Sequence, residues 1–140
     1  MKTNKKNNGE RGSSLVEFVI VIPVFMTMVM MIFQYAVYYN SALLVRTAAE
    51  QAVEAARIGS TGDWSGDATL AYNSAIARLA PSLESQGSLQ VVPVDVGNDR
   101  VRIVASVRGA ESKSLVPGLN FPINIQVSAE ADNTTIDRST

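Results

Sequence analysis

The sequence of 140 residues contains no cysteine and no histidine. Without cysteine the chain can form no disulfide, no zinc–thiolate site and no thiol nucleophile. Without histidine it lacks the commonest general base and the commonest metal ligand of proteins. The sequence also shows no phosphate-binding loop and no basic footprint for nucleic acid. We therefore expect a protein that is not an enzyme, needs no metal or other cofactor and binds no nucleic acid.

Charged residues are missing from a long stretch near the N-terminus. Between Glu17 and Arg46 there is no acidic or basic side chain, and from Phe18 to Tyr39 19 of 22 residues are hydrophobic. A helix of 22 residues rises about 33 Å, enough to cross a hydrocarbon core of about 30 Å. The run predicts a membrane-spanning helix at about residues 18–39. Its length disfavours two alternatives, a cleaved secretory signal and the buried helix of a soluble protein.

The charge of the flanking segments predicts the orientation of this helix. Residues 1–12 carry a net charge of +3, whereas residues 13–140 carry −4. The positive-inside tendency places the N-terminus in the cytoplasm and the rest of the chain outside. Tyr35, Tyr38 and Tyr39 lie at the far end of the run, where amphipathic rings favour the headgroup layer.

The helical pattern continues beyond the apolar run. Small apolar residues recur there at three- and four-residue spacing: Ala42, Val45, Ala49, Ala52 and Ala56. Gly59 is a suitable stop. We predict one helix from about residue 14 to residue 58, kinked or locally melted at Pro23, which lacks a backbone donor and crowds the preceding turn.

The remaining residues, 59–140, predict a small α+β domain. A second helix is expected at 67–80, with Leu70, Ser74, Ala77 and Leu79 loosely on one side, followed by a connector at 82–88. Alternation at Val92, Val94 and Val96 and again over 101–107 predicts a hairpin, with Pro93 suited to an edge strand. A loop over 109–120 turns at Pro117-Gly118, and a last strand turns Ile123, Ile125, Val127 and Ala129 to one side. We expect the long helix to cover this antiparallel sheet of about three strands.

The stretch "RGSSLVEFVIVIPVF" at residues 11–25 carries a more specific signal. A basic leader, Gly12, "SSLVEF" and a long apolar helix resemble the class III signal peptide of type IV pilins and pseudopilins. The Val-Glu-Phe triplet and the proline in the apolar run look most like the TadE-like minor pilins of the tight-adherence (Tad/Flp) pilus system. The alanine-rich segment up to residue 58 extends the resemblance, and the predicted helix-on-sheet architecture is pilin-like.

The resemblance implies a processing site and a recognition pair. A prepilin peptidase would cut after Gly12, removing the leader 1–12, so that Ser13 becomes the first residue, Glu17 the fifth and Phe18 the sixth. A carboxylate at the edge of hydrocarbon seeks a cation, and cleavage creates one at the amine of Ser13 or of a neighbouring subunit. The alternative is that Glu17 only complements the dipole at a helix start.

Two departures from the family pattern concern Gln34 and chain length. Gln34 stands where an acidic residue is common in the family, and the chain lacks the large insert of TadG-like relatives. The chain is longer than the major Flp pilin, which favours a minor component.

Three other features have structural alternatives. Asp63 and Asp67 could bind calcium, but such carboxylates more often cap a helix. Trp64 is a candidate for the core or for the membrane surface. The tripeptide "NTT" at 133–135 fits a glycosylation pattern that is frequent by chance.

We therefore expect a minor pilin of a bacterial Tad-type adhesive pilus, a single-pass protein of the inner (cytoplasmic) membrane. The resemblance implies as partners the prepilin peptidase, other pilins or pseudopilins, the pilus assembly platform of the inner membrane, and membrane lipid. Two alternatives remain open at this point: a binding module tethered by an uncleaved signal anchor, and a pseudopilin of a type II secretion system.

Overall fold

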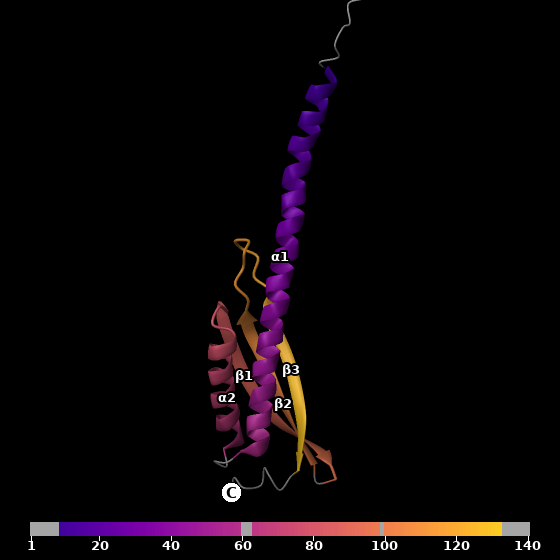
Figure 1. Ribbon diagram of the computed structural model, residues 1–140. Coiled ribbons are helices and arrows are strands. Elements are labelled where there is room, and N and C mark those ends of the chain that lie inside the picture. The colour runs from indigo at the N-terminus through magenta and orange to yellow at the C-terminus, as the bar shows by residue number, and fades with distance from the viewer. Residues whose placement is uncertain (1–8, 60–62, 99, 133–140) are drawn as a thin grey trace, which may run out of the picture.

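The computed structural model describes residues 9–59, 63–98 and 100–132 of the chain. A long helix, α1, runs the length of the molecule, and a second helix and a three-stranded sheet gather around its C-terminal half (Figure 1). The predicted α+β class is confirmed. The leader residues 1–8 and the "NTT" tripeptide lie outside the described residues.

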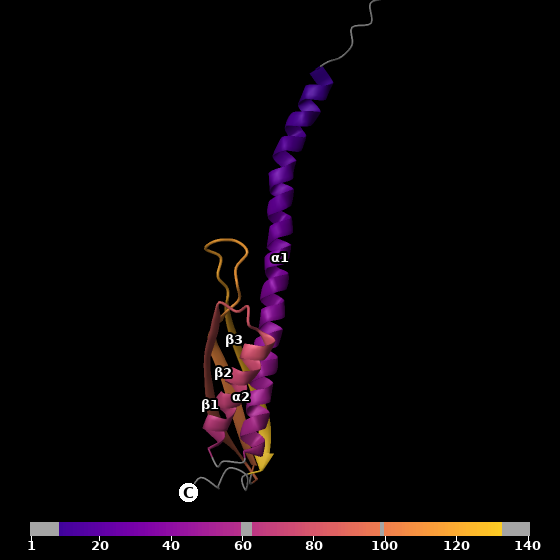
Figure 2. The same ribbon diagram turned by 60° about the vertical axis from the view of Figure 1, so that its left-hand side comes forward.

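Helix α1 spans Gly9–Ile58 without interruption. Its 50 residues correspond to about 75 Å at 1.5 Å per residue. The helix starts before the predicted residue 14, and the melting predicted at Pro23 is absent, since Pro23 lies inside a continuous helix. The hydroxyl of Thr27 donates to the carbonyl of Pro23 at 2.8 Å, which gives that carbonyl a second interaction in the turn. The ribbon curves gently in its N-terminal half (Figure 2).

The N-terminal half of α1 contacts almost nothing else in the described chain. Nearly all its large apolar side chains, from Leu15 to Phe33, are exposed. By length and composition the helix is apolar enough to cross a membrane. Because such a surface is unfavourable in water, this half of α1 fits a membrane anchor.

Helix α2 spans Trp64–Leu79, three residues earlier at its start than predicted. Its N-cap is Asp63, whose carboxylate accepts a hydrogen bond from the amide of Gly66 at 3.0 Å. Of the four residues predicted to share one side of this helix, Leu79 packs against the core, whereas Leu70 is 71% exposed and Ser74 and Ala77 are exposed as well. The residues that α2 buries are Ala68, Tyr72, Ala75 and Ile76.

The position of Tyr72 explains why α2 turns this other face inward. Its ring is buried, and its hydroxyl donates to the carbonyl of Gln86 at 2.7 Å. The largest side chain of the helix therefore enters the core with its polar group satisfied. Trp64 packs against the core, which decides between its two predicted locations.

The sheet consists of β1 (Ser85–Gly97), β2 (Arg100–Glu111) and β3 (Pro122–Asp132), antiparallel in the order β1-β2-β3. The first two strands are longer than predicted, so that part of the connector at 82–88 belongs to β1 and the loop is 112–121 rather than 109–120. Gly109 adopts positive φ at the register shift between β2 and β3, and Gly87 adopts positive φ between the pairs Gln86–Ala110 and Ser88–Arg108, so the strands continue through both glycines. A Cβ at Gly87 would lie 2.6 Å from the backbone nitrogen of Ala110, so no larger residue fits there.

The predicted inward face of the first strand is wrong. Val91 pairs with the buried Ala105, whereas Val92 and Val94 pair with Val104 and Arg102 on the outer face of the sheet and are exposed. Residues that pair across strands share a face, so the register with β2 decides the outcome. The prediction for β3 is confirmed, because Ile123 is buried and Ile125, Val127 and Ala129 pack against the core. Pro93 lies on an edge strand, as predicted.

Both helices cover the same face of the sheet (Figures 1 and 2). Helix α1 contacts β2 and β3, and α2 contacts α1 and β1. Val45, Ala49, Ala52 and Ala56 are fully buried or nearly so, as the sequence pattern predicts, and Ala48 and Val53 join them. Small side chains let α1 approach both neighbours closely. We call this assembly of residues 45–58, α2 and the sheet the packed domain.

Candidate processing and assembly site

The predicted cleavage bond, Gly12–Ser13, lies near the start of α1. Gly12 is exposed, and a Cβ built on it would meet nothing within 4 Å. The bond is helical in this structure, so a protease that reads an extended strand has to open the first turns. Glycine lowers helix stability by about 1 kcal/mol relative to alanine, which makes this opening easier.

Glu17 and Phe18 follow on the same exposed part of the helix. Phe18 is exposed, and the Glu17 side chain, also exposed, makes no hydrogen bond or ion pair with any residue of the described ranges. Residues 13 and 17 are separated by one helical turn and therefore share a face of α1. The geometry leaves the carboxylate open to a cation from residue 13 or from another chain.

A second group of polar and aromatic residues lies farther along α1. The sequence analysis noted its main member, Gln34, only as a departure from the family pattern and did not predict its contact. Gln34 is only 2% exposed, and its Oε1 accepts a hydrogen bond from the backbone amide of Leu115 at 2.7 Å. Its Nε2 has no partner within the described part of the chain. The sequence does hold one indication of this contact. Gln34 is an amide inside a charge-free apolar run, and such an amide is expected to be covered by protein.

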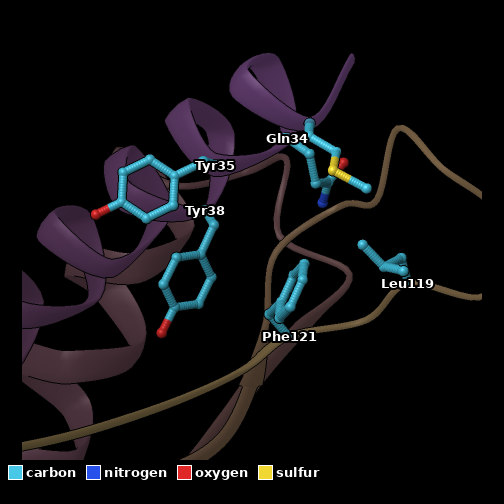
Figure 3. Close-up of a pocket in the computed structure, with 6 residues that line it drawn as sticks. Gln34, Tyr35, Tyr38, Leu119 and Phe121 are labelled. Carbon is cyan, nitrogen blue, oxygen red and sulfur yellow. The ribbon is translucent and has the colours of Figure 1, made fainter. Parts of the chain in front are cut away.

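The loop at residues 112–121 forms a pocket against α1 beside Gln34. The cavity has a volume of about 420 Å³ and an almost entirely apolar lining. Figure 3 shows side chains of α1 on one wall and those of the loop on the other. The residues that line it are Met31, Gln34, Tyr35, Tyr38, Leu119 and Phe121.

The three tyrosines at the end of the apolar run divide into two roles. Tyr35 and Tyr39 are exposed and stack with ring centroids 6.4 Å apart. Tyr38 instead packs edge-on against Phe121 of the loop, at 5.7 Å between centroids. Two of the rings are therefore free for a headgroup layer, and the third fastens the loop to the helix.

Charged groups of the packed domain form exposed pairs. Arg57 hydrogen-bonds to Glu54, as the i, i+3 spacing predicts, and this contact lowers the pKa of the Glu54 carboxyl. Arg102 lies 3.0 Å from Glu130 across β2 and β3, and its hydrogen bond lowers the pKa of that carboxyl. Such exposed pairs contribute little to stability.

Asp63 caps α2, as the helix-cap alternative predicts. Asp67 lies in the first turn of α2, where an acidic side chain complements the helix dipole. Within residues 9–59, 63–98 and 100–132, no three His, Cys, Asp or Glu side chains come together as a metal-binding group.

Comparison with known proteins bears on α1 alone. Residues 12–57 match the family model described as TadE-like protein, a range that begins at Gly12 and ends within the last turn of α1. No curated protein and no solved structure matches the chain. The resemblance predicted from the N-terminal residues is confirmed: within α1, residues 12–57 are similar to TadE-like proteins.

Proposed function

We propose that this chain is a minor pilin, or pseudopilin, of a Tad-type adhesive pilus. A prepilin peptidase removes the leader after Gly12, and the mature chain waits in the inner membrane with its N-terminus in the cytoplasm and its packed domain outside. It then takes part in pilus assembly through contacts between its apolar helix and those of other pilins at the assembly platform. The role is structural, without an enzymatic reaction.

The observation that carries this proposal is the TadE-like match over an apolar helix whose N-terminal half is uncovered. A soluble protein would bury such a surface, whereas a pilin subunit passes it from lipid to the helices of neighbouring subunits. The packed domain covers only the C-terminal half of α1 and leaves the rest available for both environments.

The free carboxylate of Glu17 supports a role in assembly. After cleavage the amine of Ser13 lies one turn from Glu17 in the same chain, or meets the Glu17 of a neighbour. In low dielectric this attraction is much stronger than in water. An unpaired carboxylate at the membrane edge therefore favours an arrangement that brings such an amine to it, and between subunits this attraction would hold neighbouring helices in register.

Intact-mass measurement of the membrane-extracted protein tests the processing step. We expect the mass of a chain that begins at Ser13, and we expect Gly12→Val to leave the leader attached. The matched control is Gly9→Val, which changes the other glycine at the start of α1 and should still be processed. A chain that begins at Met1, or one cut near residue 42, would contradict the proposal.

Replacement of Glu17 by Gln tests the assembly step separately. Cleavage should remain largely intact while the number of pili falls, because the neutral amide no longer pairs with an amine. Glu50→Gln is the control, since Glu50 is exposed on the same helix and contacts Arg46 within its own chain. A normal number of pili in the Glu17→Gln variant would contradict a role of Glu17 in pilus assembly.

A further inference from the structure

The loop at residues 112–121 connects β2 to β3 and rises from the sheet toward the N-terminal end of α1 (Figures 1 and 2). The loop contacts α1 at two points. The amide of Leu115 donates to Gln34, and the ring of Phe121 packs on Tyr38. Both contacts attach the loop to the part of α1 that belongs to the apolar run.

The loop exposes more apolar surface than a water-facing loop usually does. Leu115 is 52% exposed, and Leu119 and Phe121 are each 41% exposed. The pocket behind them is lined by apolar surface on both walls (Figure 3). Contiguous exposed apolar surface marks a site of contact with protein or membrane.

The level of the loop along α1 indicates which contact this is. Gln34 lies five residues before Tyr39, the end of the apolar run, a distance of about 7–8 Å along the helix axis. Exposed Tyr35 and Tyr39 lie at the same level. The tip of the loop is therefore level with the boundary between headgroups and acyl chains.

The apolar surface of the loop is also continuous with the uncovered half of α1. Met31 lines the pocket and is at the same time exposed on the helix. Lys113, at the base of the loop, is exposed and can stay among the headgroups while its stem lies on apolar surface. Any bilayer that surrounds α1 up to Tyr39 must also meet this loop.

We propose that residues 112–121 form a second membrane contact. Leu115, Leu119 and Phe121 enter the leaflet that faces the packed domain, and a lipid acyl chain fills the pocket between the loop and α1. Gln34 borders this pocket, but the loop covers most of its side chain and the amide of Leu115 donates to its carbonyl oxygen, which lowers the cost of an amide at this depth. This inference rests on the proposed insertion of α1 in a membrane.

Depth-dependent fluorescence quenching in vesicles of the full chain tests the contact. Trp64 is the only tryptophan, so a Trp64→Phe background allows one tryptophan to be placed at will. Leu119→Trp reports on the loop, Phe25→Trp on the middle of the apolar helix, and Leu70→Trp on an exposed position of α2. Leu115→Trp is a second loop variant in case the first disturbs the pocket, and circular dichroism checks each fold.

In phosphatidylcholine vesicles at low protein density, the loop tryptophans should be quenched most by lipids brominated near the headgroup. Phe25→Trp should be quenched most by lipids brominated near the chain end, and Leu70→Trp by neither.

Unquenched loop tryptophans together with a quenched Phe25→Trp would overturn the loop contact and leave the anchor intact. If Phe25→Trp were unquenched too, both the anchor and the loop contact would be overturned. A loop signal that changes only when chains are concentrated would assign the pocket to a second copy and overturn the lipid proposal.

Discussion

The two halves of α1 have the same secondary structure and opposite surroundings. From Leu15 to Phe33 the large side chains are exposed, whereas from Val45 to Ala56 the small ones are buried. The N-terminal half is built from bulky Val, Ile, Met and Phe that suit lipid, and the C-terminal half from alanine that suits close packing against α2 and the sheet. Side-chain size therefore separates the uncovered part of the helix from the packed part.

The largest expected difference between the two regions is the cost of removing an apolar side chain. Ile103→Ala removes a fully buried side chain of β2 and should lower the free energy of unfolding by about 2–5 kcal/mol. Ile32→Ala removes an exposed one from the anchor and should leave the packed domain within about 0.5 kcal/mol of the original. Urea unfolding in detergent, followed by Trp64 fluorescence, measures the stability of both variants. Equal losses of stability would contradict the distinction between an uncovered and a packed half of α1.

Alkaline pH should affect the packed region through Tyr72. Burial raises the pKa of Tyr72 to about 12, above about 10 for an unfolded chain. The neutral phenol therefore stabilises the fold fully below pH 10, and about 2–3 kcal/mol is lost as the pH rises from 10 to 12.

Tyr72→Phe provides the control for this pH dependence. It should cost about 1 kcal/mol at neutral pH, because the hydrogen bond to Gln86 is lost. Unfolding measured across this pH range should then show a flatter decline, since the three tyrosines of α1 remain in both proteins. An identical slope in both would show that other groups cause the loss.

Enlarging an alanine should have opposite consequences in the two halves of α1. Ala52→Leu adds bulk where the helix meets its neighbours and should destabilise the packed domain by about 1–3 kcal/mol. Ala36→Leu makes the same change at an exposed position of the apolar run and should leave the urea midpoint nearly unchanged. A tolerated leucine at position 52 would mean that the alanine contacts are loose.

The smallest expected effect is at the border between the halves. Gln34→Leu removes the acceptor of the Leu115 amide but also a donor that has no partner in the described chain, so the stability change should be about 1 kcal/mol or less. The local effect is sharper, since hydrogen exchange at the Leu115 amide should rise by roughly tenfold. Gln51→Leu, on the exposed face of the same helix, is the control and should leave this amide unchanged.

The helix and the last strand could be predicted because their patterns are local. An apolar run of 22 residues, a stripe of alanines and the alternation after Ile123 each specify one element without reference to any other. Asp63 as a cap and Pro93 on an edge strand follow from the chemistry of single residues.

The errors concern choices that depend on a neighbouring element. The inward face of β1 depends on its register with β2, and that of α2 on the carbonyl that Tyr72 reaches on β1. The continuation of β1 through Gly87 and of β2 through Gly109 depends on the pairing of the two strands with each other. The role of Gln34 in the pocket depends on a loop 81 residues away in the sequence. Periodicity within one segment holds none of this information.

The continuity of α1 through Pro23 and on to Ile58 has a mechanical consequence. A rod without a hinge transmits displacement: a pull that draws the N-terminal end by one turn, about 5.4 Å, carries the packed domain the same distance. Rotation about the axis is transmitted in the same way, because the alanine contacts hold the C-terminal half in place. A partner that binds the N-terminal end of α1 therefore also determines the position and angle of the packed domain.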